Sequence, residues 1–442
     1  MSDEGRERMP IAPANAGRNT GLARWLLLLL LLVQPYTLFV HSKYPVTVFG
    51  YSLWASALPA GIIVLVFMAT RSWEGVGGQI VLASAGIAVV VSVARRVAYQ
   101  IAFVNALNSL RWLFLVPMLL AAAGRLLAEP SIRRAGSRII IANTLVGGFI
   151  GIAYYLNLIS YRVLPTDPAI LADTTNYIPL QFKTRASGLL ASPNVFGNFL
   201  LLGILVICLT PRRNRYVLSL LGVGILVFGI ITSGSRIAIA IGILAISVFL
   251  MRTSRAGYRG IVRLTTLVIL LVALSGPILR TSQSIIGRFS GDQTGTAVAK
   301  SSLGSRAILS GPLSAVIGPR PEALFDESSK VSVSDNSWIL IGVSGGLLVF
   351  FAFVGGARAL LRPRHSRARG RYRRLYLAAC LSVLTFNNAL LWDVWIIYAV
   401  VGYWIVTYDE ASAASNEGDG PGPDLVSVGR ASVRSPRAQI GE

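Results

Sequence analysis

The chain has 442 residues, of which 54% are hydrophobic and only 14% are charged, and its formal net charge is +22. A soluble domain carries about 25% charged residues, so this composition excludes an ordinary soluble domain and indicates a membrane protein with many spans. It does not indicate nucleic-acid binding, because most of the positive residues lie in short loops between apolar segments, where membrane topology explains them.

Apolar segments long enough to be membrane helices recur along the whole chain. A bilayer core about 30 Å thick needs about twenty apolar residues per helix, and this pattern occurs about twelve times. The predicted spans are residues 25–40, 47–69, 78–93, 110–127, 139–159, 194–209, 216–231, 236–250, 261–279, 337–356, 375–391 and 392–407. The predicted fold class is therefore an all-α integral membrane protein with about twelve transmembrane helices. Cys208 and Cys380 lie inside these spans and are predicted to be small core residues rather than disulfide or metal-binding residues.

The positions of arginine and lysine predict the orientation of the chain. Cytoplasmic loops hold the excess of these residues, and the span count places the arginine-rich loops on one side. These loops are residues 125–138, 212–215, 252–263 and 358–374. Arg95 and Arg96 are the exception, since the count places them on the outer side. Residues 1–24 and 409–442 lack apolar periodicity and are predicted to be disordered cytoplasmic tails around a core of residues 25–408. The first span is predicted to be retained, because no small-residue cleavage site follows it.

Two segments on the outer side mix both charge signs and end directly against a span, residues 160–193 and 280–336. Their charges can therefore approach one another over a membrane-embedded cavity. We expect the chemistry of the protein at this outer surface.

At the end of the first outer segment, Arg185 precedes the sequence Ser192-Pro193-Asn194, which leads straight into a span. Pro193 suits the first turn of a helix, and Ser192 can cap it. Because a helix N-terminus is partly positive, it forms an anion site with an adjacent guanidinium, above all for phosphate. Arg185, Lys183 and Asn194 are therefore predicted to bind an anionic substrate. In the alternative, Ser-Pro-Asn only starts a helix and Arg185 anchors to lipid headgroups.

A polar turn, Thr232-Ser-Gly-Ser235, leads into Arg236 at the outer mouth of a later span. An arginine in this position is costly against lipid and usually faces the bundle interior or an aqueous cavity. Ser235 and Arg236 are therefore predicted to bind substrate. In the alternative, Arg236 extends its side chain to the membrane interface.

The second outer segment carries Arg306 in a stretch, residues 304–319, that is predicted to lie as an amphipathic segment on the membrane surface. The same outer segment ends in Asp335 and Asn336, where a carboxylate and an amide stand at the beginning of the next span. Asp335 is predicted to act as a general base toward an acceptor hydroxyl, with Asn336 among the substrate-binding residues. In the alternative, Asp335 only caps the helix.

The order of these features resembles the O-antigen ligase and polymerase superfamily. The features are the Arg-x-Ser-Gly…Pro-Asn segment of residues 185–194, the pair Ser235-Arg236, Arg306 in a long outer loop, and the stretch from Asp335-Asn336 to Gly346. The motifs cover residues 184–353, and the topology covers the whole chain. The resemblance implies an all-helical bundle of the type-C glycosyltransferase kind, with residues 280–336 covering the active cavity.

Members of this superfamily transfer a glycan from a polyprenyl-diphosphate carrier to an acceptor hydroxyl, outside the bacterial cytoplasmic membrane and without a metal ion or other cofactor. The resemblance implies that Arg185 and Arg306 match arginines used at the diphosphate and that Arg236 matches the Ser-Arg position. It implies a multi-pass protein with both termini in the cytoplasm, and as partners a lipid-linked oligosaccharide donor, an acceptor glycan and membrane lipids. Ligases of the superfamily normally have a His where this chain has Asp335. The two histidines of the chain lie in an early loop and a cytoplasmic cluster, where neither easily replaces it.

The predicted function is an inverting polysaccharide polymerase. Negative charge grows on the departing diphosphate, and arginine stabilises it with planar, bidentate donors that keep their proton. The acidic residues Glu322, Asp326 and Glu327 of the long loop are not predicted to bind a metal. Two alternatives remain, which are ligase-type transfer of a finished glycan to a lipid or other acceptor, and a transporter or flippase for lipid-linked glycans. A transporter favours inverted repeats, and no clear repeat of the helix set is present.

Overall fold

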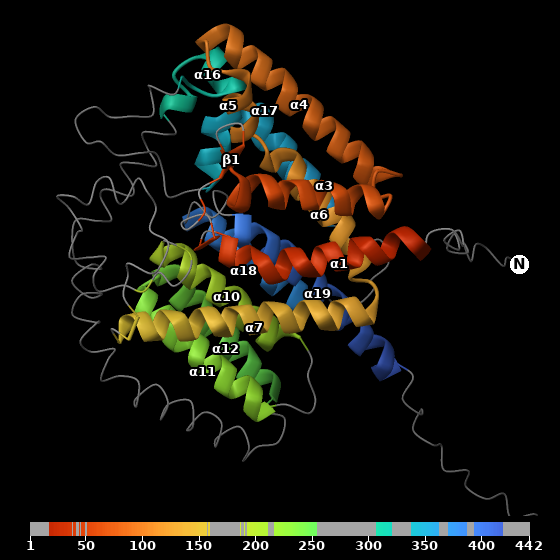
Figure 1. Ribbon diagram of the computed structural model, residues 1–442, viewed down its shortest axis with the longest axis vertical. Helices are drawn as coiled ribbons and strands as arrows, with labels where there is room; N and C mark the ends of the chain where they lie inside the picture. Colours follow the sequence, from red (N-terminus) through yellow and green to blue (C-terminus); the bar gives the residue numbers. More distant parts are fainter. Residues whose placement is uncertain are drawn as a thin grey trace, which may run out of the picture.

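The computed structural model of this protein describes residues 17–37, 39–40, 44, 46–48, 51–156, 158–159, 186, 190, 192–210, 216–253, 306–320, 337–361, 370–386 and 393–418. Within these ranges the regular structure is helical, apart from one short antiparallel pairing of β1 (Thr47–Val48) with β2 (Tyr51–Ser52). The predicted all-α class is therefore confirmed (Figure 1).

Eleven of the twelve predicted spans overlap a helix, and residues 261–279 lie outside the described residues. The predicted span 47–69 is wrong at its start, because residues 47–48 and 51–52 form the β1–β2 pairing and helical structure begins at Leu53. The long helices are α1 (Gly17–Val33), α3 (Leu58–Ala69), α4 (Val76–Tyr99), α6 (Trp112–Leu126), α7 (Pro130–Tyr155), α10 (Pro193–Leu209), α11 (Tyr216–Ser233), α12 (Arg236–Thr253), α17 (Ser337–Leu360), α18 (Arg371–Phe386) and α19 (Asp393–Gly418). The short ones are η2 (Gln34–Tyr36), the π-helix η3 (Leu53–Ala57), α5 (Phe103–Ser109) and α16 (Pro312–Ile317).

Three of the described helices, α4, α7 and α17, are long and apolar enough to cross a membrane. A fourth candidate is the pair α5 and α6, which is bent by 45°, if the pair is counted as one span. The other described helices are shorter, except α19, which has 26 residues. For example, α10 has 17 residues, so at about 1.5 Å per residue it covers roughly 25 Å of a bilayer core of about 30 Å. The structure thus supports a helical membrane protein, whereas the number of twelve spans stays a prediction.

Helix α1 and helix α19 run into the two predicted tails. Residues 17–24 and 409–418 are helical, whereas the sequence predicts disorder there. The difference has a physical reason, because Asp409 of α19 pairs with the guanidinium of Arg133 in α7 at 2.6 Å and so ties the helical extension to the bundle. The remaining parts of both predicted tails lie outside the described residues.

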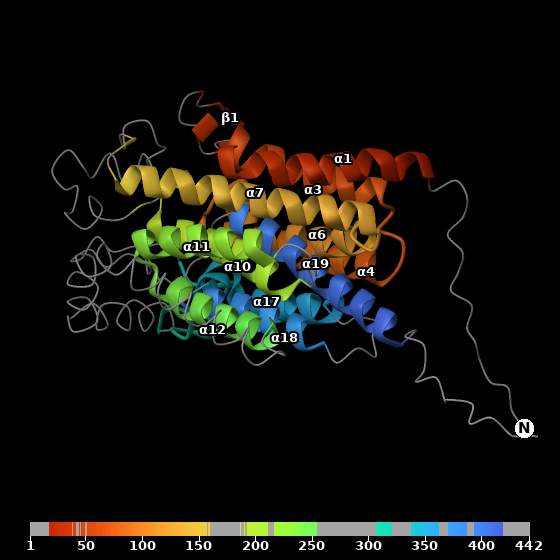
Figure 2. The same ribbon diagram turned by 90° about the horizontal axis from the view of Figure 1, so that it is seen from below.

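Helix α10 forms the centre of the bundle. Every side chain from Val195 to Leu209 is buried, and the helix contacts α7, α11, α12, α18 and α19. A helix covered on all sides needs apolar residues on all its faces, and Asn198 is the polar exception in this stretch. Small residues allow α7 to approach closely, since a Cβ on Gly151 would lie 2.4 Å from Cζ of Phe196. Figure 2 shows α7, α11 and α19 beside α10.

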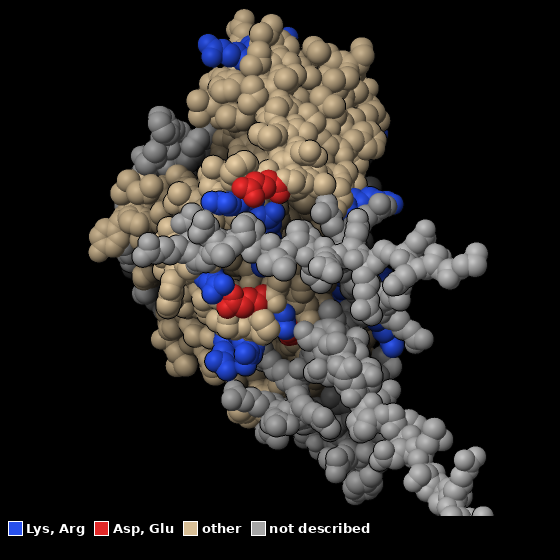
Figure 3. Space-filling view, turned by 90° about the vertical axis from the view of Figure 1, so that its right-hand side faces the viewer, with Lys and Arg blue, Asp and Glu red and all other residues tan. Residues whose placement is uncertain are grey.

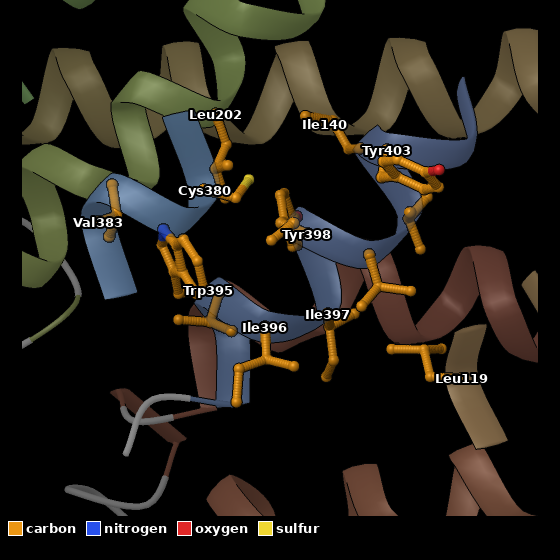
Figure 4. Packing of buried hydrophobic residues seen from close by; sticks show 14 of the residues in the cluster. Leu119, Ile140, Leu202, Cys380, Val383, Trp395, Ile396, Ile397, Tyr398 and Tyr403 are labelled. Atoms are coloured by element: carbon orange, nitrogen blue, oxygen red, sulfur yellow. The ribbon is translucent and has the colours of Figure 1, made fainter. Parts of the chain in front are cut away.

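A buried hydrogen-bond network around Tyr398 of α19 joins this helix to α1 and α7. Its hydroxyl donates to the carbonyl of Leu31 in α1 at 2.6 Å and accepts from Nδ2 of Asn143 in α7 at 2.7 Å. Its ring packs edge-on against Phe199 of α10, with ring centroids 5.1 Å apart. Figure 4 shows Tyr398 in the apolar core together with Cys380, and both cysteines of the chain are buried, as predicted for core residues.

We expect Tyr398→Phe to destabilise the protein by about 1 to 2 kcal/mol, because the buried Asn143 amide loses one of its acceptors and Leu31 one of its donors. The measurement is the thermal unfolding midpoint in detergent, which should fall. Ser382→Ala is the matched control, because that exposed hydroxyl bonds only within its own helix, to Ala378. An unchanged midpoint in Tyr398→Phe would contradict a stabilising role of the network.

Charged residues lie at both ends of the bundle. One end, which we call the basic end, contains the starts of α1, α4 and α7 and the ends of α3 and α6. There, Arg125 donates to the carbonyls of Thr70 at 2.9 Å and Arg71 at 2.7 Å, and Arg24 pairs with Glu129. Figure 3 shows Lys, Arg, Asp and Glu side chains gathered on this face. The opposite end, which we call the loop end, contains the starts of α10, α12, α17 and α19 and the ends of α4, α7, α11 and α18.

Candidate functional site

The start of α10 lies at the loop end, as the Ser-Pro-Asn pattern predicts. Pro193 occupies the first helical turn, and Ser192 stands at the N-cap with an extended backbone (φ −123°, ψ 125°). Its carbonyl accepts the first helical hydrogen bond from Phe196 at 2.9 Å. The predicted side-chain cap is not observed, since the Ser192 side chain makes no capping hydrogen bond. Asn194, a predicted substrate-binding residue, is exposed in the same first turn.

The polar turn between α11 and α12 is tight and buried. Thr232, Ser233 and Ser235 are all buried, and Gly234 adopts a φ of 62°, a conformation that glycine reaches without steric cost. The hydroxyl of Ser233 donates to the carbonyl of Ile230 at 2.6 Å and accepts from the backbone N–H of Ser235 at 3.2 Å. Polar side chains thus hold the turn that presents the start of α12.

Two of the three sequence patterns meet at this place. The backbone N–H of Ala186 donates to the carbonyl of Thr232 at 2.9 Å, which brings the residue after Arg185 to the turn before Arg236. The turn also touches α10 directly, because a Cβ on Gly197 would lie 2.5 Å from both Oγ of Ser233 and Cβ of Ser235. The first outer segment, the start of α10 and the start of α12 therefore form one cluster, which we call the α10 cluster.

The side chains of three predicted residues in this region are not described. Arg185 and Lys183 lie outside the described residues, and of Arg236 only the backbone is described, at the first position of α12. Ser235 is 2% exposed and lies against α10. Substrate contact by these side chains stays a prediction.

Asn198 is a polar residue of the α10 cluster that is absent from the predicted site residues. It lies one helical turn after Asn194 and next to Gly197, and it is 1% exposed. Both its Nδ2 and its Oδ1 lack a hydrogen-bond partner among the described residues. Burying such a group without a partner costs about 1 to 3 kcal/mol. An amide inside an otherwise apolar membrane helix is the sequence signal that identifies it, since polar groups in that setting are costly and usually functional.

The third pattern lies at the loop end beside α17. Arg306 begins a helical turn and is exposed, whereas the next two residues, Ala307 and Ile308, are buried. Ile308 packs on α17, because a Cβ on Gly342 would lie 2.8 Å from its Cδ1. Large apolar residues on the other side of this segment are exposed, among them Leu309. Apolar residues thus lie on both the buried and the exposed side, and the amphipathic position on the membrane surface stays a prediction.

The structure does not join Arg306 to the α10 cluster, since no hydrogen bond or ion pair between them occurs in the described part of the chain. Figure 1 shows α16 beside α4, α5 and α17, whereas α10, α11 and α12 lie with α7. Asp335 and Asn336 lie outside the described residues, and α17 begins directly after them at the buried Ser337. The convergence of Arg185 with Arg306 therefore stays a prediction.

The loop end is positively charged in the part that the structure describes. Arg95, Arg96, Arg111, Arg306 and Arg320 lie there, against one carboxylate, Asp393. That carboxylate is paired, since Nη2 of Arg111 lies 2.9 Å from its Oδ1. An excess of guanidinium groups at one end favours the approach of an anionic substrate.

The described residues hold no group of three or more His, Cys, Asp or Glu side chains that could bind a metal. The acidic residues Glu322, Asp326 and Glu327 lie outside the described residues. The described side chains also line an apolar cavity of about 460 Å³ between α3 and the bend of α5 and α6, with Ser56, Asn108 and Arg111 as its polar members. None of the predicted site residues lines this cavity.

Fold and composition together define the class of the protein as an all-helical protein with candidate membrane spans. In comparisons with protein-family models, curated proteins and solved structures, none matches this chain.

Proposed function

We propose that this protein is a membrane polysaccharide polymerase. It transfers a glycan from a polyprenyl-diphosphate-linked donor to a hydroxyl of an acceptor glycan, with inversion and without a metal. The loop end faces outward from the bacterial cytoplasmic membrane, and the basic end faces the cytoplasm, in accordance with the excess of arginine in cytoplasmic loops. The observation that carries the proposal is the α10 cluster, where Ala186 and the start of α10 both contact the turn before Arg236. The residue after the contacting Gly197 is Asn198, a buried amide without a hydrogen-bond partner among the described residues.

The cluster suits a diphosphate for electrostatic reasons. The N-terminus of α10 carries partial positive charge. Arg185 directly precedes Ala186, which bonds to Thr232, and Arg236 directly follows Ser235, which lies against Gly197. Two guanidinium groups bind the diphosphate oxygens by bidentate hydrogen bonds. Because charge on the leaving diphosphate grows as the sugar bond breaks, these groups bind the transition state more strongly than the ground state.

The reaction forms one bond and breaks one. The oxygen of the acceptor hydroxyl forms a bond to C1 of the donor sugar, and the bond from C1 to the diphosphate oxygen breaks with its electron pair. The hydroxyl proton goes to the carboxylate of Asp335, and the polyprenyl diphosphate leaves. Because the acceptor attacks from the face opposite the leaving group, the anomeric centre inverts.

The test of the proposed function uses the purified protein in nanodiscs with radiolabelled lipid-linked repeat units. A polymerase produces a ladder of longer lipid-linked glycans. In a strain that lacks the gene, single repeat units then accumulate on the carrier. Finished chains that accumulate on the carrier would instead indicate a ligase, and labelled glycan that crosses liposomes unchanged would indicate a transporter.

We expect Asn198→Leu to raise the KM for the lipid-linked donor about tenfold, the effect of losing one hydrogen bond of about 1.4 kcal/mol. The variant should fold normally, because an apolar side chain of similar size replaces an unpartnered buried amide. The measurement is the KM of chain growth with purified protein, and Leu202→Met on the same helix is the control. An unchanged KM in Asn198→Leu would exclude the amide from the donor site.

A further inference from the structure

Helix α17 is broken close to the loop end. Gly345 (φ −158°, ψ 15°) and Gly346 (φ 73°, ψ −171°) depart from helical geometry, so backbone groups on both sides lose their helical partners. In a membrane such groups must find partners within the protein. Arg95 supplies one, because Nη1 of its guanidinium donates to the carbonyl of Ser344 at the break.

The same break receives the segment that follows Arg306. The backbone of residues 316–318 touches the break with no room for side chains, since a Cβ on Gly346 would lie 2.3 Å from the carbonyl oxygen of Val316. A Cβ on Gly318, whose φ is 87°, would lie 2.5 Å from the carbonyl oxygen of Val343. Backbone thus packs against backbone at this point, and both glycines are required by a left-handed φ and by the close approach.

Arg95 and Tyr99 of α4 bind both partners of this contact. Besides Ser344, the guanidinium of Arg95 reaches the carbonyl of Pro319, 3.5 Å from Nη2. The hydroxyl of Tyr99 donates to the carbonyl of Gly318 at 3.0 Å, and the guanidinium of Arg320 lies over the Tyr99 ring, 5.7 Å from its centroid. Arg95 is 5% exposed, so its charge is directed at these carbonyls rather than at solvent.

We propose that Arg95, assisted by Tyr99, is a positioning residue that fixes the segment of residues 306–320 to the break in α17 and thereby sets the place of Arg306. Arg306 begins the docked segment, and Ile308 anchors its first turn on Gly342. The role in chain growth rests on the proposed function, whereas the docking of the segment does not. The outer position of Arg95, which departs from the usual distribution of arginine in membrane proteins, has its physical reason in this contact.

Cysteine labelling tests the docking of the segment and does not depend on enzymatic activity. The two native cysteines, Cys208 and Cys380, are buried and should not interfere. Ile317→Cys, at a 5% exposed position in the docked segment, is treated with a hydrophilic maleimide in detergent. We expect slow labelling with native Arg95 and labelling about tenfold faster or more in Arg95→Gln, because loss of the contact opens the segment locally. Tyr99→Phe, which removes only one hydroxyl, should accelerate labelling less. Leu313→Cys, 52% exposed, should label at the same rate in every background.

The control substitution is Arg96→Gln, which removes the neighbouring exposed arginine and should leave the labelling of Ile317→Cys slow. Slow labelling in both Arg95→Gln and Tyr99→Phe would overturn the docking role, whatever the effect on chain growth. Faster labelling in a protein with no chain growth in any form would leave the docking intact and remove the proposed function instead.

In an active protein, Arg95→Gln should lower kcat, and adding Arg306→Ala should lower it little further. Full activity of Arg95→Gln despite faster labelling would overturn the link to Arg306.

Discussion

Arg185→Ala and Arg306→Ala should each lower chain growth by about 10² to 10³-fold, the usual effect of removing one donor to a developing negative charge. Arg185 precedes Ala186 in the sequence, and the N–H of Ala186 donates to the carbonyl of Thr232. Arg306 lies in a segment that packs on α17 through Ile308. Because a guanidinium stabilises the leaving diphosphate mainly in the transition state, the loss should fall on kcat rather than only on KM.

The measurement is the initial rate of elongation with purified lipid-linked repeat units, at equal amounts of folded protein. Arg96→Ala is the matched control, because Arg96 is an exposed arginine at the same end of the bundle that makes no contact with the proposed site in the described part of the chain. It should elongate at the native rate. Persistent elongation in both Arg185→Ala and Arg306→Ala would remove the diphosphate role of these arginines.

Asp335→Asn should lower kcat by about 10² to 10⁴-fold, the usual worth of a general base. Asn caps a helix as well as Asp does, so the start of α17 at Ser337 should form normally in the variant. Donor binding should be retained, because the amide removes basicity and leaves the arginines in place.

Slow turnover with intact donor binding would show that Asp335 acts as a general base and does not only cap the helix. The measurements are kcat for elongation and the Kd for the donor under conditions without acceptor. Asp292→Asn, at another carboxylate of the long outer loop, is the control and should behave like the native protein. Full activity of Asp335→Asn would refute the assignment of the base.

The class of the fold followed from local sequence properties. Apolar stretches placed eleven of the predicted spans on described helices, because a helix that is covered by lipid and by other helices must be apolar over its whole length. The predicted positions of the helix ends were less exact. Helix α1 begins before its apolar stretch and α19 continues beyond its own, both through charged residues. Pairing of Asp409 with Arg133 stabilises that continuation, and such a partner is not visible in the sequence.

The candidate site was predicted in part. The Ser-Pro-Asn start of α10 and the turn at Ser235 lie where the patterns indicate, because proline and small polar residues act on their own backbone. Asn198 is absent from the predicted site residues, although the sequence shows it as an amide in an otherwise apolar helix. Its burial without a partner among the described residues is visible only in the structure. The predicted cap by the Ser192 side chain is absent.

The sequence by itself determined that the described part of this chain is helical with candidate membrane spans, where most of these helices lie, and which polar segments are candidates for chemistry. These are properties of neighbouring residues, and hydropathy and turn preferences act over short stretches of chain. Only the tertiary structure decided that position 186 meets Thr232 and that Arg95 binds at the break in α17. An arginine at a helix end has the same local sequence whether it faces lipid headgroups or a buried carbonyl, so contacts between distant segments decide between the two.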